Sequence, residues 1–195
     1  MRFEKTKITI DRELSDLDRF AIRFTEILYR HTPYVIVSGY VAILFGRARG
    51  SEDVDIIIPK LNDQKCHLLL TELLQQSYYC LNADSEKDIV ESLSENLPVR
   101  FAQKDTIIPN IELKYARTLF DEIAVEKRIP VYIDTKCLFI SPLELQIAFK
   151  EAVLQSPKDL EDARHMKKVA EGHIDNRLIH KFKEMLYDFY QTKPK

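Results

Sequence analysis

The stretch Val35–Pro59 reads VIVSGYVAILFGRARGSEDVDIIIP, and it decides the fold. It opens with a short apolar run of β-branched residues, which is typical of a buried strand. Residues 40–45 then favour a short helix, and residues 47–52 form a polar loop. A second apolar run over residues 54–58 predicts another strand, which Pro59 ends. Two strands joined by a helix and a loop indicate a mixed α/β protein.

Composition narrows the class of protein. The chain has 195 residues, 45% of them hydrophobic, and a net charge of −2, which indicates a globular protein and argues against a DNA-coating one. Only four glycines are present, and three of them, Gly39, Gly46 and Gly50, fall in the deciding stretch. No apolar run approaches the roughly 20 residues that span a bilayer. The N-terminus lacks the apolar core of a signal peptide. We therefore expect a cytoplasmic protein with no membrane partner.

The rest of the chain divides into two parts. Helical or strand periodicity predicts helices over 14–31, 63–77 and from 85, and strands over 99–102, 107–113, 131–133 and 137–140. After Ile140 the sequence changes character. Capping boxes at 141–144 and 156–159, each with Pro at the first helical position, and a cap at Asp175 predict helices. We expect an α/β core over residues 1–140 and a helical C-terminal region over residues 141–195.

Several residues of the deciding stretch suit phosphate binding. Gly39 lies where a strand turns into the N-terminus of a helix, and free N–H groups and the helix dipole favour an anion there. Arg47 and Arg49 follow on the loop, and guanidinium groups pair well with phosphate oxygens. Ser51 adds a hydroxyl donor. The turn and loop together therefore predict a phosphate-binding site.

Asp53 and Asp55 are the candidate metal ligands. Because alternate residues of a strand share a face, both carboxylates point the same way while Val54 and Ile56 point into the core. Side-by-side carboxylates repel each other unless a cation lies between them, and Mg²⁺ takes one or two carboxylates together with substrate phosphates. A lone Asp-x-Asp is more often a solvated strand edge. Its position after a strand–glycine–helix turn, with arginines between, favours phosphoryl or nucleotidyl transfer.

This arrangement resembles the nucleotidyltransferase superfamily related to DNA polymerase beta, whose signature is an apolar strand, Gly-Gly or Gly-Ser, and then Asp-x-Asp. Gly39 matches the glycine, and residues 53–55 match the carboxylate pair. The customary dipeptide is either Ser38-Gly39 in reversed order or Gly39-Tyr40. Ser38 supplies the hydroxyl in the first case, and the hydroxyl is missing in the second. The resemblance implies an α/β (α+β) fold: a small mixed sheet flanked by helices, with a helical C-terminal region.

The superfamily uses a third carboxylate on a later strand. In the segment IPNIELKYA, Glu112 and Lys114 face one way and Ile111 and Leu113 the other. The resemblance implies that Glu112 helps to hold a metal ion and acts as base for the incoming hydroxyl. It places Lys114 near a phosphate or the departing pyrophosphate. The alternative is that Glu112 is an ordinary exposed strand residue.

The segment SPKDLEDARHM, over residues 156–166, resembles a helix of AbiEii-like nucleotidyltransferases, which include toxins of toxin–antitoxin systems. The resemblance implies that Lys158 and Asp162 contribute to the active-site cleft and that an antitoxin protein is a partner. The alternative is a helix with ordinary surface pairs, such as Glu161 with His165. The likeness to the superfamily extends over residues 35–168, but its specific part is the glycine followed by Asp-x-Asp.

The resemblance implies transfer of an NMP from an NTP to a hydroxyl of tRNA, a protein or a small molecule. It assigns two Mg²⁺ ions, or Mn²⁺ in their place, to Asp53, Asp55 and Glu112. It assigns nucleotide binding to Ser38, Gly39, Arg47, Arg49, Ser51, Lys114 and Lys158. The alternative function is a nucleotide-binding or partner-binding module with the same fold and weakened catalysis, which the irregular order of Ser38-Gly39 favours.

Overall fold

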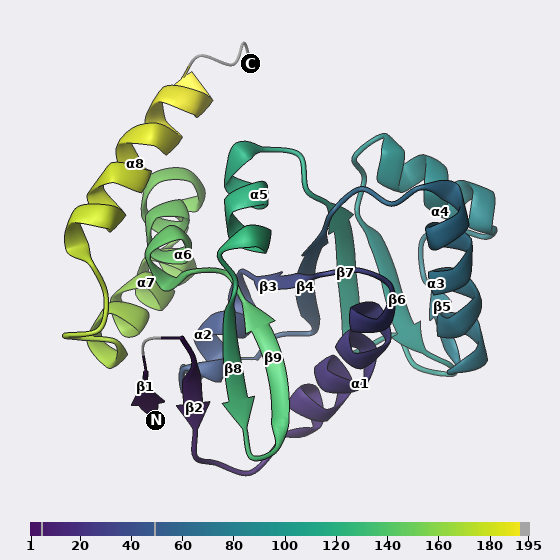
Figure 1. Ribbon diagram of the computed structural model, residues 1–195, viewed down its shortest axis with the longest axis horizontal. Helices are drawn as coiled ribbons and strands as arrows, with labels where there is room; N and C mark the ends of the chain where they lie inside the picture. Colours follow the sequence, from purple (N-terminus) through teal and green to yellow (C-terminus); the bar gives the residue numbers. More distant parts are fainter. Residues whose placement is uncertain (5, 49, 192–195) are drawn as a thin grey trace.

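A computed structural model describes residues 1–4, 6–48 and 50–191 of the protein. Within these residues one mixed sheet has the strand order β1-β2-β8-β9-β3-β4-β7-β6-β5 (Figure 1). The strands are β1 (Arg2–Phe3), β2 (Ile8–Ile10), β3 (Val35–Val37), β4 (Asp53–Ile58), β5 (Tyr78–Cys80), β6 (Val99–Gln103), β7 (Asn110–Tyr115), β8 (Ile129–Ile133) and β9 (Lys136–Ile140). The predicted α/β class is therefore confirmed.

Helices cover both faces of this sheet. They are α1 (Asp16–His31), α2 (Gly39–Leu44), α3 (Asp63–Gln75), α4 (Glu86–Ser94), α5 (Leu119–Glu126), α6 (Leu143–Phe149), the π-helix η1 (Lys150–Leu154), α7 (Pro157–Val169) and α8 (Asn176–Gln191). None of those in the described part of the chain is long and apolar enough to cross a bilayer.

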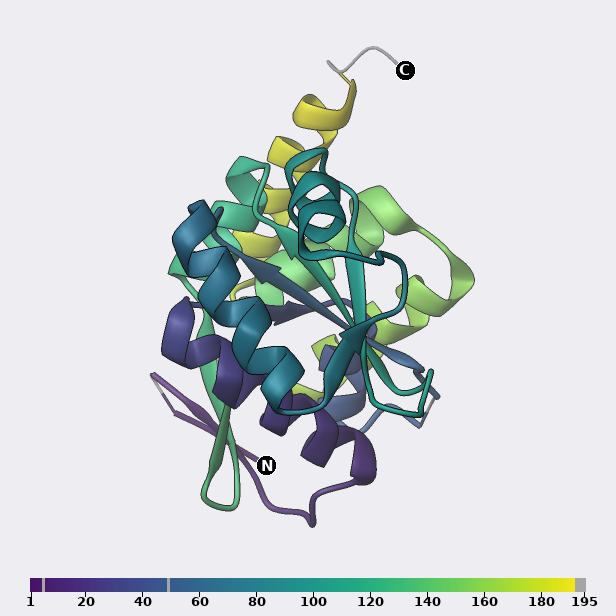
Figure 2. The same cartoon turned by 90° about the vertical axis from the view of Figure 1, so that its right-hand side faces the viewer.

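The centre of the sheet is formed by β3, β4 and β7. Strand β4 runs antiparallel to β3 and parallel to β7. Val54 and Ile56 are fully buried, and between them Asp55 points to the opposite face. On the apolar face, α1 packs against the sheet, and its Phe24 ring meets Tyr78 edge-on at 5.1 Å. Figure 2 shows α1 and α3 side by side on this face, which leaves the carboxylates on the other one.

The helices after β9 share the apolar core with the sheet. Leu145, Met166 and Leu186 belong to the same buried cluster as Val54 and Ile56. In Figure 1, α6, α7 and α8 lie together at the side of the sheet away from α3 and α4. Of these C-terminal elements, α6 and η1 lie over the face of the sheet that carries Asp55.

The predicted helix caps are only partly present. Ser156 accepts the N–H of Asp159, as predicted, and Ser85 caps α4 in the same way. The predicted capping box at Ser141 is wrong, because α6 has Pro142 at its cap position and no side-chain cap. The N–H of Ser141 donates to the Ile36 carbonyl at 3.0 Å, so Ser141 continues the pairing of β9 with β3. The cap position of α6 falls on Pro142, whose side chain has no acceptor, so Ser141 lies one residue outside the helix.

Other local differences follow from weak sequence signals. The strand predicted over 107–113 begins only at Asn110, because Pro109 has no N–H to donate to a ladder. The short strands β1, β2 and β5 and the helix α5 were not predicted. Each of them is eight residues or shorter, and β1 and β5 form the edges of the sheet. Few periodic positions fit into such short segments.

Candidate active site

Three carboxylates share the face of the sheet opposite α1. Asp53 and Asp55 lie two residues apart on β4, and Glu112 of β7 is directly opposite Asp55 in the register. Neighbouring strands are about 4.8 Å apart, so Asp55 and Glu112 are adjacent across the ladder. The structure therefore brings together the three acidic residues that the sequence singled out.

Asp55 lies close to both of the other carboxylates. Burial raises the pKa of its carboxyl above the ordinary value, and the charges of Glu112 and Asp53 raise that pKa further. A hydrogen bond from Ser38 and the positive charge of Lys114 act in the opposite direction. A half-buried carboxylate beside two others has the oxygen chemistry that Mg²⁺ prefers. The donor set therefore fits a divalent cation.

The backbone at Ser38 is strained. Its φ of 64° and ψ of −133° lie in a region that side chains with a Cβ rarely adopt. Gly39, by contrast, begins the six-residue helix α2 and has no positive φ. The conformation that calls for glycine is therefore at Ser38, one residue before the predicted position. In this conformation the Ser38 side chain reaches Asp55, and its N–H donates to Gln146 Oε1 at 3.2 Å.

The loop before β4 is held from two sides. The Ser51 hydroxyl donates to the carboxylate of Asp53 at 3.1 Å and so orients it. Arg47 pairs with Glu161 and lies with its Nε 3.5 Å from Asp162 Oδ1, both on α7. In this structure Arg47 therefore ties its loop to α7. The predicted nucleotide contact at Arg49 lies outside the described residues.

A buried lysine that the sequence analysis did not select lies near this loop. Lys158 is exposed in the first turn of α7 and does not line the cavity beside Asp55. Lys150 is 1% exposed, and its Nζ lies 2.9 Å from Asp159 Oδ1 and 3.1 Å from Asp162 Oδ2. In the sequence, Lys150 stands within an apolar segment, and the two acids that it pairs with, Asp159 and Asp162, follow it. Lys150 and Arg47 together pair with the three acidic residues of α7.

Arg100 is a second residue that the sequence analysis missed. It lies opposite Glu112 on β6, and its Nη2 and Nε are 3.0 and 3.2 Å from Glu112 Oε2. Within the described residues, no three His, Cys, Asp or Glu side chains are arranged to hold a metal ion as they stand. Arg100 contacts Oε2 alone, so Oε1 of Glu112 has no bond to Arg100, while the positive charge of Arg100 competes with a cation held by Asp53 and Asp55.

A cavity of about 260 Å³ lies next to Asp55, between the sheet and the helices α5, α6 and η1. Ser38, Asp55 and Lys114 line its sheet side. No ion pair of Lys114 is found in the part of the chain that the structure describes. The cavity therefore places an ammonium group and a carboxylate next to the strained turn.

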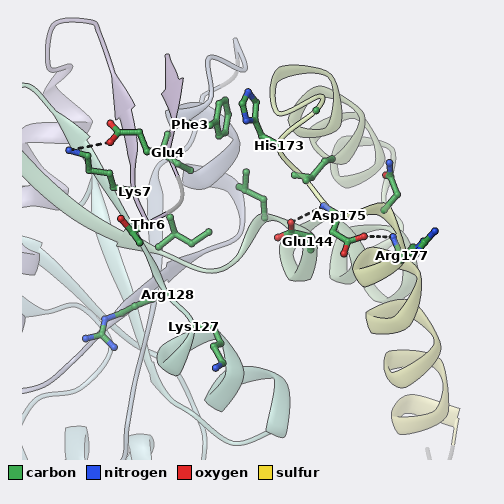
Figure 3. A pocket seen from close by; sticks show the side chains of 16 residues that line it. Phe3, Glu4, Thr6, Lys7, Lys127, Arg128, Glu144, His173, Asp175 and Arg177 are labelled. Carbon is green, nitrogen blue, oxygen red and sulfur yellow. Dashed lines mark hydrogen bonds and ion pairs between the residues drawn. The ribbon is translucent and has the colours of Figure 1, made fainter.

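A larger cavity, of about 1090 Å³, lies elsewhere, between the N-terminal strands and the start of α8 (Figure 3). None of the three carboxylates lines it. Its wall includes His173 stacked on Phe3, with ring centroids 4.7 Å apart. Glu144 there accepts the N–H of Asp175, and Asp175 accepts the N–H of Arg177. These acidic groups cap the start of α8, so this cavity is not the candidate site.

The turn at Ser38 is also held by α1. Tyr40, in the first turn of α2, donates its hydroxyl to Asp18 Oδ1 at 2.6 Å. Asp18 is fully buried and also receives bonds from Arg12 and Ser15. Burial by itself raises the pKa of Asp18, but the hydrogen bonds outweigh burial and lower that pKa to about 2. Asp18 is therefore a charged anchor that fixes α2, and with it the turn, against α1.

Comparison with known proteins identifies the fold. No family model matches the sequence, and no curated protein matches it. Among solved structures, an antigenic nucleotidyltransferase-like protein from Paracoccidioides brasiliensis has a TM-score of 0.52 and 14% identity, over 89% of this chain and 87% of that one. The antibiotic-resistance factor ANT(2'')-Ia in solution has a TM-score of 0.52 and 12% identity, over 91% and 95%.

A crystal structure of ANT(2'')-Ia in complex with adenylyl-2''-tobramycin has a TM-score of 0.54 and 12% identity, over 89% of this chain and 97% of that one. At such identities the likeness shows a shared fold and not a shared activity. The protein therefore has a nucleotidyltransferase fold, as the sequence predicted.

Proposed function

We propose that the protein is a metal-dependent nucleotidyltransferase that moves an NMP from an NTP to a hydroxyl acceptor. The observation that carries this proposal is the placement of Asp55 opposite Glu112, with Asp53 on the same face, beside a cavity lined by Lys114. The nucleotidyltransferase fold of the structural neighbours supports it. Neither the fold nor the carboxylates would suffice alone, because one fold hosts many functions.

Each side chain then has a task. Asp53, Asp55 and Glu112 would hold two Mg²⁺ ions, or Mn²⁺, which when bound neutralise the phosphates and make the α-phosphorus more electrophilic. Ser51 orients Asp53, as its hydrogen bond to that carboxylate suggests. Lys114 contacts the phosphates. The predicted phosphate contacts of Ser38, Gly39, Arg47, Arg49, Ser51 and Lys158 stay part of the proposal.

NMP transfer is a substitution at the α-phosphorus. The acceptor oxygen forms a bond to this phosphorus, and the bond from it to the oxygen that bridges the α- and β-phosphorus atoms breaks. Pyrophosphate leaves. The proton of the acceptor hydroxyl passes to Glu112, whose Oε1 has no bond to Arg100.

The test uses NTPs labelled at the α-phosphate, with Mg²⁺ and three acceptor classes: tRNA, proteins and aminoglycosides. Tobramycin is included because one structural neighbour was solved with its adenylylated form. We expect the double variant D53N/D55N to lose transfer by about 100-fold or more, since it lacks the metal-binding charges. Asp134→Asn, in the exposed β8–β9 turn, is the matched control. Equal transfer by the wild type and the double variant would refute the proposal.

The finer assignment to an AbiEii-like toxin rests on the resemblance of residues 156–166. We propose an antitoxin protein as the partner in that case. Expression of the wild type should then arrest growth, and Asp55→Ala should abolish the arrest. A neighbouring gene for a small helical protein would support the pairing, and normal growth on wild-type expression would exclude it.

A second candidate function is a nucleotide-binding module without turnover. The ion pair between Arg100 and Glu112 favours it, because the third carboxylate is already neutralised. Calorimetry separates the two candidates. Tight NTP binding with no release of pyrophosphate in the presence of any acceptor would support the module.

A further inference from the structure

The cavity beside Asp55 has mostly apolar walls. Its apolar side chains come from β3, β4, α5, α6 and η1: Val37, Ile57, Phe120, Ala124, Leu145, Phe149 and Leu154. Asp121 also borders it, but Asp121 accepts the N–H groups of Arg117 and Thr118 and so caps α5. Unlike the sheet side with Asp55 and Lys114, these apolar walls do not suit a triphosphate, because burying charge against apolar surface is costly. An uncharged, flat group of matching size suits these walls.

One buried amide in this cavity presents a free donor. Gln146 is 6% exposed and lines the cavity. Its Oε1 accepts the N–H of Ser38, and this bond fixes which end of the amide carries the NH₂ group. No hydrogen bond from Nε2 is found among the described residues, and Nε2 is not one of their fully buried polar atoms without a partner. The donor is therefore accessible to a ligand that offers an acceptor.

Ser38 connects this amide to the reaction centre. Its N–H contacts Gln146 and its side chain contacts Asp55. A group bound against Gln146 is therefore separated from the Asp55 carboxylate by one residue, Ser38. Phe120 and Phe149 offer aromatic faces in the same cavity, and aromatic side chains stack well on bases.

We propose that this cavity receives the nucleobase of the donor NTP, and that Gln146 donates a hydrogen bond to a ring nitrogen or carbonyl oxygen of the base. This inference rests on the proposed function and goes beyond it by assigning the nucleoside end of the substrate.

The first experiment changes the amide. Calorimetry measures the affinities for the four Mg·NTPs and for Mg·tripolyphosphate, which has no base. Gln146→Leu removes the donor, and we expect about tenfold weaker NTP binding with tripolyphosphate binding unchanged. Gln146→Glu keeps an acceptor for the Ser38 N–H but loses the donor. In this variant too, the affinity for NTPs should fall relative to the affinity for tripolyphosphate. Gln75→Leu, on the exposed surface of α3, is the matched control.

The second experiment fills the cavity. Ala124→Leu extends a side chain into the space for the base, so NTP binding should fall by about tenfold or more while tripolyphosphate binding persists. Ala124→Ser keeps the space open and should bind NTPs nearly as the wild type does. Thermal unfolding of each variant shows that it is folded.

The outcomes separate the two proposals. If the wild type binds none of the NTPs, both the proposed function and this inference are wrong. If the wild type binds NTPs and the Gln146 and Ala124 variants bind them equally well, this inference alone is overturned. It is also overturned if Ala124→Leu keeps NTP binding and loses use of the acceptor, because the cavity then holds the acceptor.

Discussion

At the scale of single residues, Ser38 combines a strained backbone with two contacts in the site. Strain of this kind costs of order 1–3 kcal/mol and persists where surrounding structure enforces it. Here Gln146 holds the N–H and the side chain reaches Asp55. The reversed order of Ser38-Gly39 therefore places a hydroxyl at the cost of an unfavourable φ.

Two substitutions at Ser38 separate these effects. We expect Ser38→Gly to raise the free energy of unfolding by about 1 kcal/mol, because glycine adopts a φ of 64° without strain. Ser38→Ala keeps the strain and should not stabilise the protein. Both variants lose the hydroxyl, so both should transfer NMP more slowly. Urea denaturation measures the stabilities, and equal stability of the two variants would contradict the strain argument.

Arg100 is the residue that competes with a cation for Glu112. We expect Arg100→Met to bind Mn²⁺ up to about fivefold more tightly, since an exposed ion pair contributes roughly 0.2–1 kcal/mol. Electron paramagnetic resonance of free Mn²⁺ measures this without relying on activity. Arg19→Met, on the exposed surface of α1, should leave the affinity unchanged. Weaker Mn²⁺ binding by Arg100→Met would show that Arg100 does not compete.

At the scale of elements, η1 and α7 are joined by buried charge. Lys150→Met would leave Asp162 buried with one partner fewer, and Asp159 likewise. Breaking a buried pair in this way costs about 3–5 kcal/mol. We expect a loss of about 3 kcal/mol for Lys150→Met and less than about 0.5 kcal/mol for the exposed Lys158→Met. Chemical denaturation of the two variants makes the comparison, and similar losses would refute it.

The junction of α1 with α2 predicts a pH dependence. The pKa of Asp18 is about 2 in the folded protein, against 3.8 for the unperturbed group. A lowered pKa means that Asp18 stabilises the fold fully above about pH 4, and that this stabilisation is lost as the pH falls toward 2. The expected loss is about 2 kcal/mol.

Asp18→Asn tests this origin of the pH dependence. We expect the variant to be less stable than the wild type at pH 7 and to approach the wild type near pH 2. Thermal unfolding across this range measures both curves. A constant difference between the curves from pH 7 to pH 2 would show that the charge of Asp18 does not contribute.

At the scale of the whole molecule, the candidate site depends on the packing of distant segments. The cavity beside Asp55 has its floor on the sheet and its walls on α5, α6 and η1. Leu145 and Met166 share a buried cluster with Val54. The division into a core over residues 1–140 and a helical region over residues 141–195 stays a proposal. Residues of both parts line the cavity beside Asp55.

The local pattern sufficed for much of the site. The alternation of β4 was visible in the sequence, and the register of the sheet places Asp53 and Asp55 on one face as that alternation predicts. Lys158 was chosen by its match to a helix motif, while Lys150 is the lysine that the structure buries. Burial depends on what packs over a residue, and a motif within one helix does not contain that information. The cap at Ser141 differed for a similar reason, since its N–H is held by β3.

The sequence by itself determined the strand–turn–helix–strand unit and the shared face of Asp53 and Asp55, because both follow from backbone geometry over a few consecutive residues. Only the tertiary structure decided that β7 lies beside β4, which brings Glu112 next to Asp55, and that β6 brings Arg100 to Glu112. Only it decided that Gln146 closes a cavity over Ser38, 108 residues away. These contacts depend on strand order and on helix packing across the whole core, which no local pattern specifies.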